Sequence, residues 1–153
     1  MDRFMALEIV SYKAEHALEI IKGQAKQPTL EINEQTIEWA KMKENRGPAV
    51  TGIYEGRIIG CGGLEIIYAG FAEGWCLFVA DIGEYGFMPK AVKRILAAWI
   101  EEYKLIRIQA PLRVDFPEGI RFAEWLGLEY EGLLRKYHAD HSDARMFALI
   151  IER

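Results

Sequence analysis

Residues 115–137, DFPEGIRFAEWLGLEYEGLLRKY, decide the fold, because they combine a short helix, a glycine stop and a strand that follows at once. Asp115 and Glu118 have the spacing of a capping box at the start of a helix. Gly127 can adopt the left-handed conformation that ends a helix. We therefore predict a short capped helix that ends at Gly127 and leads directly into a strand.

The composition is that of an ordinary globular protein. The chain has 153 residues, 51% hydrophobic and 27% charged, which is large enough to bury roughly two-thirds of the surface that the unfolded chain exposes. We expect residues 1–153 to form a single domain. With 19 basic and 23 acidic residues the net charge is −4, which argues against binding to nucleic acid or an anionic membrane, since both favour a basic excess.

The cysteines and the apolar segments indicate the compartment. Cys61 and Cys76 are the only cysteines, and we interpret both as reduced, buried strand residues. The first eight residues, MDRFMALE, lack the apolar run of a signal peptide, and no later segment approaches the ~20 apolar residues of a membrane helix. The sequence thus predicts a soluble, cytoplasmic protein.

Hydrophobic periodicity predicts the remaining elements and their order. Apolar residues recur at helical spacing in three segments, and runs typical of strands fill most of the rest. The order is βααβββαβαββ, an α/β fold with a mixed β-sheet flanked by helices. The expected elements are a strand at 7–13, a helix from 14 to 23, a helix capped by Asn33 that ends near 45–47, strands at 49–54, 57–68 and 75–79, a loose turn at 69–74, a helix at 88–103, a strand at 105–114, the capped helix, and strands at 130–137 and 145–151.

A glycine cluster lies inside the strand predicted at 57–68. Gly60, Gly62 and Gly63 surround Cys61, but a phosphate-binding loop would open a helix, which this cluster does not. We interpret the glycines as a β-bulge or a place where another backbone comes close.

The stretch 115–137 resembles the C-terminal motif of the GNAT acyltransferase superfamily, an amphipathic helix ending in Leu-Gly-Phe before a strand with Glu-Gly. Here the triplet is Leu126, Gly127 and Leu128. The order βααβββαβαββ is also that of the GNAT fold. The resemblance implies a splayed parallel pair at the centre of the sheet, formed by strands 75–79 and 105–114. It also implies acetyl-CoA or another acyl-CoA as co-substrate, held in the wedge between these strands.

The resemblance also assigns residues to CoA. The family holds pantetheine by backbone groups of the first strand of the pair, and the pyrophosphate by amides at the start of the next helix, where unsatisfied N–H groups favour anions. The backbone groups for pantetheine map to Leu77, Phe78, Val79 and Ala80.

The loop before that helix departs from the family, whose loop reads Gln/Arg-x-x-Gly-x-Gly/Ala. Aligned from Val79, this chain has Glu84 at the first position, and Phe87 and Pro89 at the two glycine positions. An acid, a bulky ring and a residue without an N–H each disfavour phosphate. A shift by one residue brings Gly86 closer to register without restoring the motif.

Three cations near the start of the helix at 88–103 offer another source of phosphate affinity. Lys90, Lys93 and Arg94 can bind phosphate by charge in place of amides. The alternative is that they form an ordinary solvated helix face.

Amine acylation needs a base for the amine proton and often an acid for the leaving thiolate. The family frequently uses a tyrosine of the C-terminal helix as the acid, but Ala123 stands at that position. Glu73 is our candidate base, with Glu65 behind it, unless both are solvated near a hairpin end. Tyr85 and Tyr137 are candidate acids if their hydroxyls point into the wedge.

Four residues of one loop have the types of metal ligands. His138, Asp140, His141 and Asp143 lie close together in the sequence, but a flexible hairpin loop lacks the fixed geometry that zinc sites require. We interpret them as a polar loop and predict no metal site.

Two functions follow from these expectations. The first is a divergent acyl-CoA-dependent N-acyltransferase that acts on an amine of a small molecule or of a protein. The second is a catalytically inactive protein with a structural or assembly role, because residues 75–128 also resemble GNAT-like proteins encoded by phages and prophages. The partner would then be a second copy in a homodimer, or a virion protein.

Overall fold

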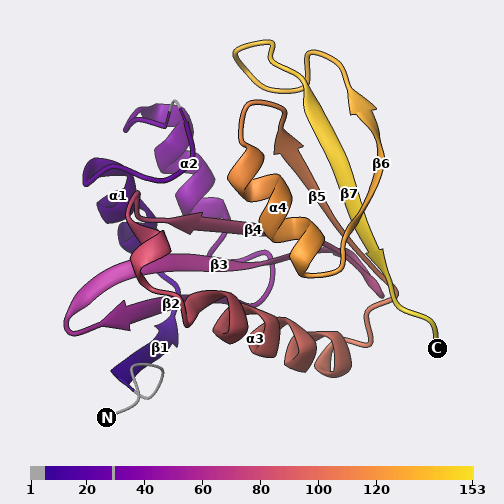
Figure 1. The fold of residues 1–153 in the computed structure, drawn as a ribbon, viewed down its shortest axis with the longest axis horizontal. Helices are drawn as coiled ribbons and strands as arrows, with labels where there is room; N and C mark the ends of the chain where they lie inside the picture. Colours follow the sequence, from indigo (N-terminus) through magenta and orange to yellow (C-terminus); the bar gives the residue numbers. More distant parts are fainter. Residues whose placement is uncertain (1–5, 29) are drawn as a thin grey trace. The chain divides into compact units, whose positions relative to one another are not determined.

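A computed structural model describes residues 6–28 and 30–153 (Figure 1), so Met1 to Met5, the start of the stretch searched for a signal peptide, lie outside the described residues. The elements follow the order βααβββαβαββ, as the sequence predicts. The strands are β1 (Leu7–Ser11), β2 (Ala49–Tyr54), β3 (Arg57–Tyr68), β4 (Phe71–Phe78), β5 (Arg107–Arg113), β6 (Glu129–Leu134) and β7 (Ala144–Ile150). The helices are α1 (Ala14–Lys22), α2 (Glu34–Met42), α3 (Met88–Glu102) and α4 (Pro117–Trp125), with a 3-10 turn η2 at Ile82–Glu84.

The strands form one mixed sheet of seven strands in the order β1-β2-β3-β4-β5-β7-β6. β4 and β5 run parallel, with Phe71–Glu73 opposite Arg107–Gln109. The pairs β1–β2, β2–β3, β5–β7 and β6–β7 are antiparallel. The α/β fold with a central parallel pair is therefore confirmed.

The chain divides into two compact units. The first unit comprises residues up to Glu65 together with Trp75–Ile95, and the second comprises Ile66–Gly74 together with Leu96–Arg153. The expectation of a single domain stays a prediction.

The core of the first unit forms where α1 and α2 bury their apolar faces with β3 and the end of β4. The apolar spacing on α1 places Ala17, Ile20 and Ile21 on one buried face. Asn33 caps α2 as predicted, because its side chain accepts a hydrogen bond from the Thr36 N–H at 3.0 Å.

The glycine cluster of β3 marks close packing, as expected. A Cβ added at Gly60 would clash with the ring of Phe78, and one at Gly63 would clash with the backbone of Pro48. The β2–β3 register also shifts between Gly52 and Ile53, which indicates a bulge beside the cluster.

The core of the second unit lies between α4 and the strands β5 and β7, which Figure 1 draws side by side. Gly127 ends α4 with φ +102°, and its N–H donates to the Glu124 carbonyl at 3.0 Å. The Leu128 N–H donates to the Ala123 carbonyl at 3.0 Å, which completes a Schellman motif. Leu128 and Ala123 are both 6% exposed. The predicted glycine stop is confirmed.

The predicted capping box at the start of α4 is wrong. Phe116 occupies the N-cap position, and no side chain caps the helix there. The carboxylate of Asp115 instead accepts two hydrogen bonds from the Arg113 guanidinium, at 2.9 and 3.1 Å. A bidentate ion pair is stronger than a single bond to a backbone N–H, so it takes the carboxylate away from the helix.

Three predicted boundaries are also wrong. β6 ends at Leu134 and not at 137, because its pairing with β7 ends there, opposite Ala144. β4 begins at Phe71 and not at Trp75, because the parallel partner β5 pairs with its first residues and Gly70 completes a tight turn with φ +86°. α2 ends at Met42, before the predicted 45–47, because the N–H groups of Glu44 and Asn45 bond to carbonyls three residues back and tighten the chain into a turn.

The cysteines are both free thiols, and only one is fully buried. Cys61 is 4% exposed and Cys76 is half-buried. Burial raises the pKa of the Cys61 thiol well above its ordinary value and that of Cys76 to about 12, so both sulfurs are poor nucleophiles. Among the described residues, every helix is too short or too polar to cross a membrane.

Candidate functional site

The end of β4 belongs to the first unit and carries the backbone groups assigned to pantetheine. The Val79 N–H donates to the Ile59 carbonyl of β3 at 3.1 Å. Successive residues of a strand direct their backbone groups to opposite edges. Phe78 and Ala80 therefore direct theirs to the edge that faces away from β3.

Residues 24–27, which follow α1, occupy this edge; we call them the strap. The Lys26 N–H donates to the Phe78 carbonyl at 2.8 Å, and the Ala80 N–H donates to the Gln24 carbonyl at 3.2 Å. These two bonds flank an isolated antiparallel bridge. The strap thus pairs with β4 as a short antiparallel strand.

The side chain of Gln27 extends the pairing by one bond. Its Nε2 donates to the Cys76 carbonyl at 2.7 Å. Its Oε1 is buried and has no hydrogen-bond partner among the described residues. The carbonyls of Cys76 and Phe78 and the N–H of Ala80 are therefore all bonded to the chain's own residues.

The side chains of the four residues assigned to pantetheine serve packing. Leu77 and Val79 are buried, at 1% and 6% exposed, and belong to the core of the first unit. Phe78 and Ala80 are half-buried. Whatever these residues offer to a ligand, they offer through the backbone.

The loop between β4 and α3 uses several of its own amides. η2 tightens the loop, and the amides concerned donate to carbonyls three residues earlier. They are the N–H groups of Ile82, Glu84, Tyr85 and Met88, at 2.9 to 3.1 Å. A phosphate group would have to rely on other donors.

Arg57, the first residue of β3, fixes this loop. Its guanidinium binds the Asp81 carboxylate with bonds of 2.9 and 3.0 Å, and it also donates to the Tyr85 hydroxyl at 2.8 Å. These hydrogen bonds hold the pKa of Asp81 below its usual range. Because the Tyr85 hydroxyl accepts from a cation, it is engaged in fixing the loop.

The ring of Phe87 packs against other aromatic residues of the first unit. Its centroid lies 5.3 Å from that of Tyr54 and 6.1 Å from that of Tyr85. Gly83 and Gly86 lie on either side of Tyr85, and a Cβ added at either would meet no atom within 4 Å. The loop thus keeps open space over two glycines although the family's glycine positions are lost.

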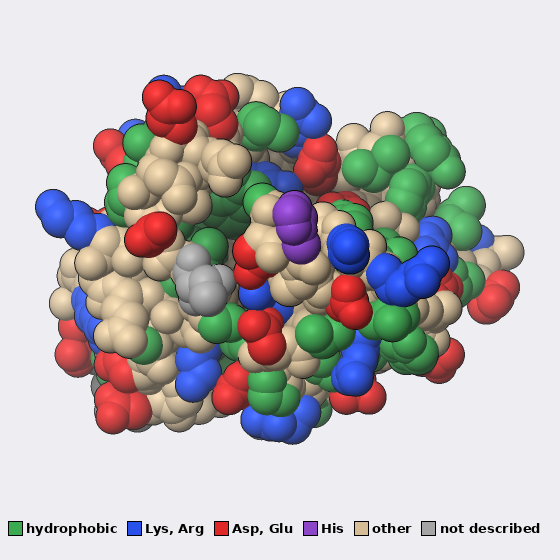
Figure 2. Space-filling model, turned by 90° about the horizontal axis from the view of Figure 1, so that it is seen from above, with side chains coloured by type: hydrophobic (Ala, Val, Ile, Leu, Met, Phe, Trp, Pro, Cys, Tyr) green, Lys and Arg blue, Asp and Glu red, His purple; other side chains and the backbone are tan. Residues whose placement is uncertain are grey.

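The three cations proposed for phosphate lie on the surface of α3. Lys90, Lys93 and Arg94 are exposed, as both the phosphate reading and the solvated-face reading require. On the face of the molecule seen in Figure 2, acidic and basic side chains are intermingled.

Glu73, the candidate base, lies in β4 within the second unit. It stands opposite Gln109 of β5, whose Nε2 donates to the Glu73 carboxylate at 3.0 Å. Gln109 in turn accepts from Arg107 at 3.1 Å, and Arg107 binds Glu131 at 2.7 Å. A chain of polar side chains therefore holds the Glu73 carboxylate in place.

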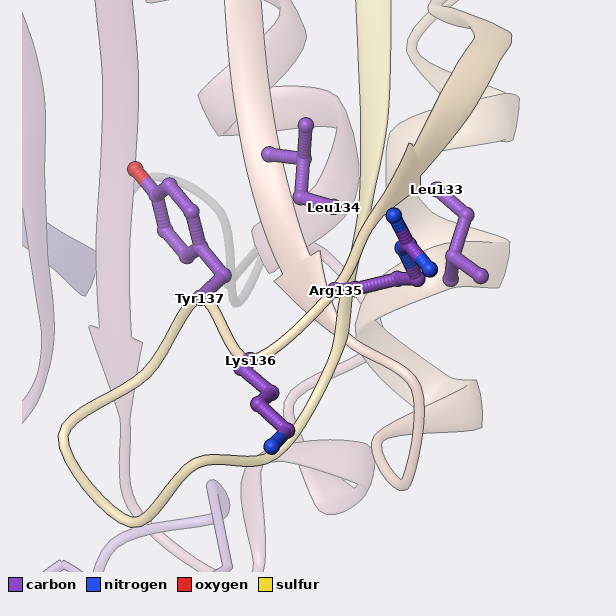
Figure 3. A pocket seen from close by; sticks show the side chains of 5 residues that line it. All are labelled: Leu133, Leu134, Arg135, Lys136 and Tyr137. Carbon is purple, nitrogen blue, oxygen red and sulfur yellow. The ribbon is translucent and has the colours of Figure 1, made fainter.

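Tyr137 lies near enough to Glu73 to be affected by its charge. Burial, and then the negative charge of Glu73, raise the pKa of Tyr137 above its ordinary value. Its side chain is also the last of the five that line a hollow formed by Leu133 to Tyr137. Figure 3 shows those side chains pointing in different directions, with the Tyr137 hydroxyl directed away from Lys136, so the hollow has no common binding point.

Glu65, the second candidate base, is committed to ion pairs. Its carboxylate lies 3.0 Å from the Lys43 Nζ and 3.0 Å from an Arg46 nitrogen. Burial raises the pKa of Glu65, but the hydrogen bonds from Lys43 and Arg46 outweigh it and lower the pKa overall. The Lys43 ammonium also lies over the rings of Trp39 and Trp75. Glu65 is therefore held in its charged form by two cations, which makes it a poor base.

The loop with metal-like residues is organised by hydrogen bonds. Asp140 binds Arg113 at 2.8 Å and accepts a bond from the Ser142 hydroxyl at 2.6 Å. Asp143 accepts the Lys136 N–H at 2.9 Å. Within 6–28 and 30–153, no group of three His, Cys, Asp or Glu side chains could hold a metal ion.

Sequence reasoning missed two groups in the first unit. The strap carries no alternation of apolar residues, so no periodic signal marks it as a strand partner. Arg57 follows directly on the Glu55-Gly56 turn, and the hairpin register would have placed it at the end of the strand pair. Nothing in the sequence, however, links it to Asp81.

Comparisons with known proteins give different results for the sequence and for the structure. No family model and no curated protein matches the sequence. Solved structures match closely: Ard1 from Thermoplasma volcanium is 17% identical, with 97% of this chain and 99% of that chain covered and a TM-score of 0.78. An acetyltransferase of the GNAT family from Bacillus anthracis is 19% identical, with 95% of each chain covered and a TM-score of 0.69. The chain has the GNAT fold.

Another structure with the GNAT fold supports the same assignment. The ribosomal-protein-S18-alanine N-acetyltransferase from Escherichia coli is 18% identical, with 96% of this chain and 95% of that chain covered and a TM-score of 0.74. Such low identity shows the fold alone, because one fold can host many activities. Function must be argued from the site.

Proposed function

We propose that this chain is a divergent acyl-CoA-dependent N-acyltransferase acting on an amine of a small molecule or of a protein. The observation that carries the proposal is the Glu73 carboxylate, held in place by the Gln109 amide at 3.0 Å. Glu73 would accept the proton of the attacking amine, and Tyr137 would donate one to the leaving thiolate. The pKa of Tyr137 lies above the ordinary tyrosine value of ~10, so its hydroxyl is protonated at neutral pH and can act as a proton donor.

The reaction would form one bond and break another. The amine nitrogen attacks the carbonyl carbon of the thioester, the C–N bond forms and the C–S bond breaks. The amine proton goes to Glu73, and the CoA sulfur leaves as a thiolate that takes the Tyr137 proton. The products are an amide and free CoA thiol.

The first unit would hold the CoA. By resemblance, backbone groups of Leu77 to Ala80 would take the pantetheine, and the phosphates would lie over Gly83 and Gly86, where space is open. The exposed cations Lys90, Lys93 and Arg94 would supply charge in place of the loop amides. In support, one solved structure of similar fold, RimL, 14% identical, is in complex with coenzyme A.

Proteins of similar fold suggest the substrate class to test first. They include spermidine N-acetyltransferase from Vibrio cholerae and N-acetyltransferases of ribosomal proteins. We propose a polyamine or a protein N-terminal amine as the first acceptors to try.

The test is an assay of CoA thiol release from acetyl-CoA with spermidine and with a peptide that begins with alanine. Replacing a general base typically lowers kcat 10²- to 10⁴-fold, so Glu73→Gln should lower kcat by ~100-fold or more. Glu129→Gln, an exposed carboxylate of β6, is the matched control and should leave kcat unchanged. Equal rates for wild type and Glu73→Gln would remove Glu73 from the mechanism.

A second candidate is a non-enzymatic role, such as a phage or prophage protein with a virion partner or a homodimeric partner. Two observations favour it: the strap occupies the edge of β4, and four loop amides are used within the loop. Under this reading CoA leaves the melting temperature unchanged. A ligand at 100 times its Kd would instead stabilise the fold by ~2.7 kcal/mol.

A further inference from the structure

We infer that the strap, residues 24–27, competes with the pantetheine arm of CoA for the edge of β4, so that CoA binds only after the strap has left. The inference rests on the proposed function, because it concerns the regulation of the same CoA site. It makes the chain self-inhibited while the strap is paired with β4.

The strap occupies the edge that the resemblance assigns to pantetheine. By the resemblance that arm binds backbone groups of Leu77 to Ala80, and the edge that faces away from β3 is the one that could receive it, because Val79 is bonded to Ile59 of β3. The Phe78 carbonyl and the Ala80 N–H direct their hydrogen bonds to this edge, and both are bonded to the strap at 2.8 and 3.2 Å. The Ala80 N–H is a single donor, so it cannot bond fully to the strap and to pantetheine at once.

The strap and the pantetheine arm also share their chemistry. Pantetheine is a chain of secondary amides, each with one N–H donor and one carbonyl acceptor. The strap presents the Lys26 N–H, the Gln24 carbonyl and the side-chain amide of Gln27. It therefore offers β4 the same kinds of groups as the ligand.

The strap is held in a way that favours displacement. Gln24 has φ +85°, a left-handed conformation that is uncommon and unfavourable for a non-glycine residue. The Gln27 Oε1 is buried without a partner among the described residues, an unfavourable state that departure of the strap would relieve. The strap residue Ala25 packs against the core cluster of the first unit, and its side chain is small.

The experiment measures CoA affinity by titration calorimetry in wild type and two variants at one position. Lys26→Pro removes the N–H that donates to Phe78 and opens the edge. Lys26→Ala keeps that N–H and changes only the side chain, so it is the matched control. Hydrogen exchange verifies the opening: in Lys26→Pro the Ala80 amide should exchange faster, while the Val79 amide, bonded to β3, should stay protected.

The expected result is that Lys26→Pro binds CoA at least tenfold more tightly than wild type, and that Lys26→Ala binds as wild type does. If wild type and both variants bind CoA with equal affinity although the Ala80 amide exchanges faster in Lys26→Pro, the strap does not compete with CoA. The proposed function would still stand. If no form binds CoA although the edge is open, both the strap and the proposed function are rejected. The rate of thiol release by wild type checks this outcome. Release of CoA thiol would show that CoA does bind and that the titration failed to detect it.

Discussion

Two corners of this molecule, each joining a strand and a helix, differ in how they use their backbone groups. At the end of α4, Gly127 and Leu128 close the helix with two hydrogen bonds and bury apolar side chains. After β4, loop amides bond within the loop, and the strap takes the open edge of the strand. The first corner keeps the pattern of the GNAT fold, and the second departs from the family's loop.

The comparison indicates that the fold does not depend on the surface to which we propose that CoA binds. The α4 corner is stabilised by apolar burial and by a backbone conformation that glycine provides. The β4 corner needs only that its polar backbone groups be bonded, and the chain's own amides meet that need as well as a ligand would. A sequence can therefore lose the CoA loop and keep the GNAT fold.

The largest expected effect is at the α4 corner. Phe147 of β7 is 2% exposed and packs with α4, so Phe147→Ala should lower the free energy of unfolding by ~3–5 kcal/mol. Urea denaturation measures it. Leu133→Ala, at a position 49% exposed in β6, is the control and should change stability by less than ~0.5 kcal/mol. Equal urea midpoints for Phe147→Ala and wild type would show that this corner does not carry the core.

The next largest expected effect is at the β4 corner. If Lys90, Lys93 and Arg94 supply phosphate affinity in place of loop amides, replacing all three with glutamine should weaken CoA binding by at least ~100-fold, since charged hydrogen bonds contribute ~1.5–3 kcal/mol each. Stability should stay near that of wild type because the three residues are exposed. Titration calorimetry decides, and an unchanged CoA affinity would leave them as a solvated helix face.

A smaller effect isolates the helix stop. Gly127 has φ +102°, and a residue with a Cβ in the left-handed region loses ~1–2 kcal/mol. Gly127→Ala should therefore lower stability by about that amount in thermal denaturation. Gly132→Ala is the control, because a Cβ there meets no atom within 4 Å. Similar losses in both variants would mean that strand effects and not the cap dominate.

The smallest effect is electrostatic and depends on pH. Hydrogen bonds from Arg113 hold the pKa of Asp115 and of Asp140 below their usual range. A lowered carboxyl pKa contributes stability above the unfolded value of ~3.9, and this contribution is lost as pH falls toward the folded value. Arg113→Gln should thus lower the urea midpoint at neutral pH and approach wild type in acid. A difference that grows as pH falls would contradict this sign.

The sequence predicts the fold well because periodicity reports local structure. The order of elements, the Asn33 cap and the Gly127 stop depend on near neighbours and are confirmed. The capping-box spacing predicts the wrong partner for Asp115, because spacing alone does not show that Arg113 binds its carboxylate. β4 begins earlier than predicted because β5, distant in sequence, supplies its partner.

The candidate site is less predictable because its contacts are remote in sequence. The place of Glu73 in the sequence suggests it as a candidate base, but the residue that holds its carboxylate, Gln109, is 36 residues away. The strap reaches β4 across about fifty residues, and Gln27 bonds to Cys76 at a separation of 49. No local pattern encodes such pairings, because they are set by how the elements assemble.

Hydrogen exchange of wild-type protein with and without CoA tests whether the strap closes the edge of β4 that we assign to pantetheine. Without CoA, the amides of Lys26 and Ala80 should be protected, because each donates a hydrogen bond in the strap pairing. With saturating CoA, the Lys26 amide should lose its protection while the Val79 amide, bonded to β3, keeps it. A Lys26 amide that is unprotected without CoA, or that stays protected when CoA is bound, would show that the strap does not compete with CoA for β4.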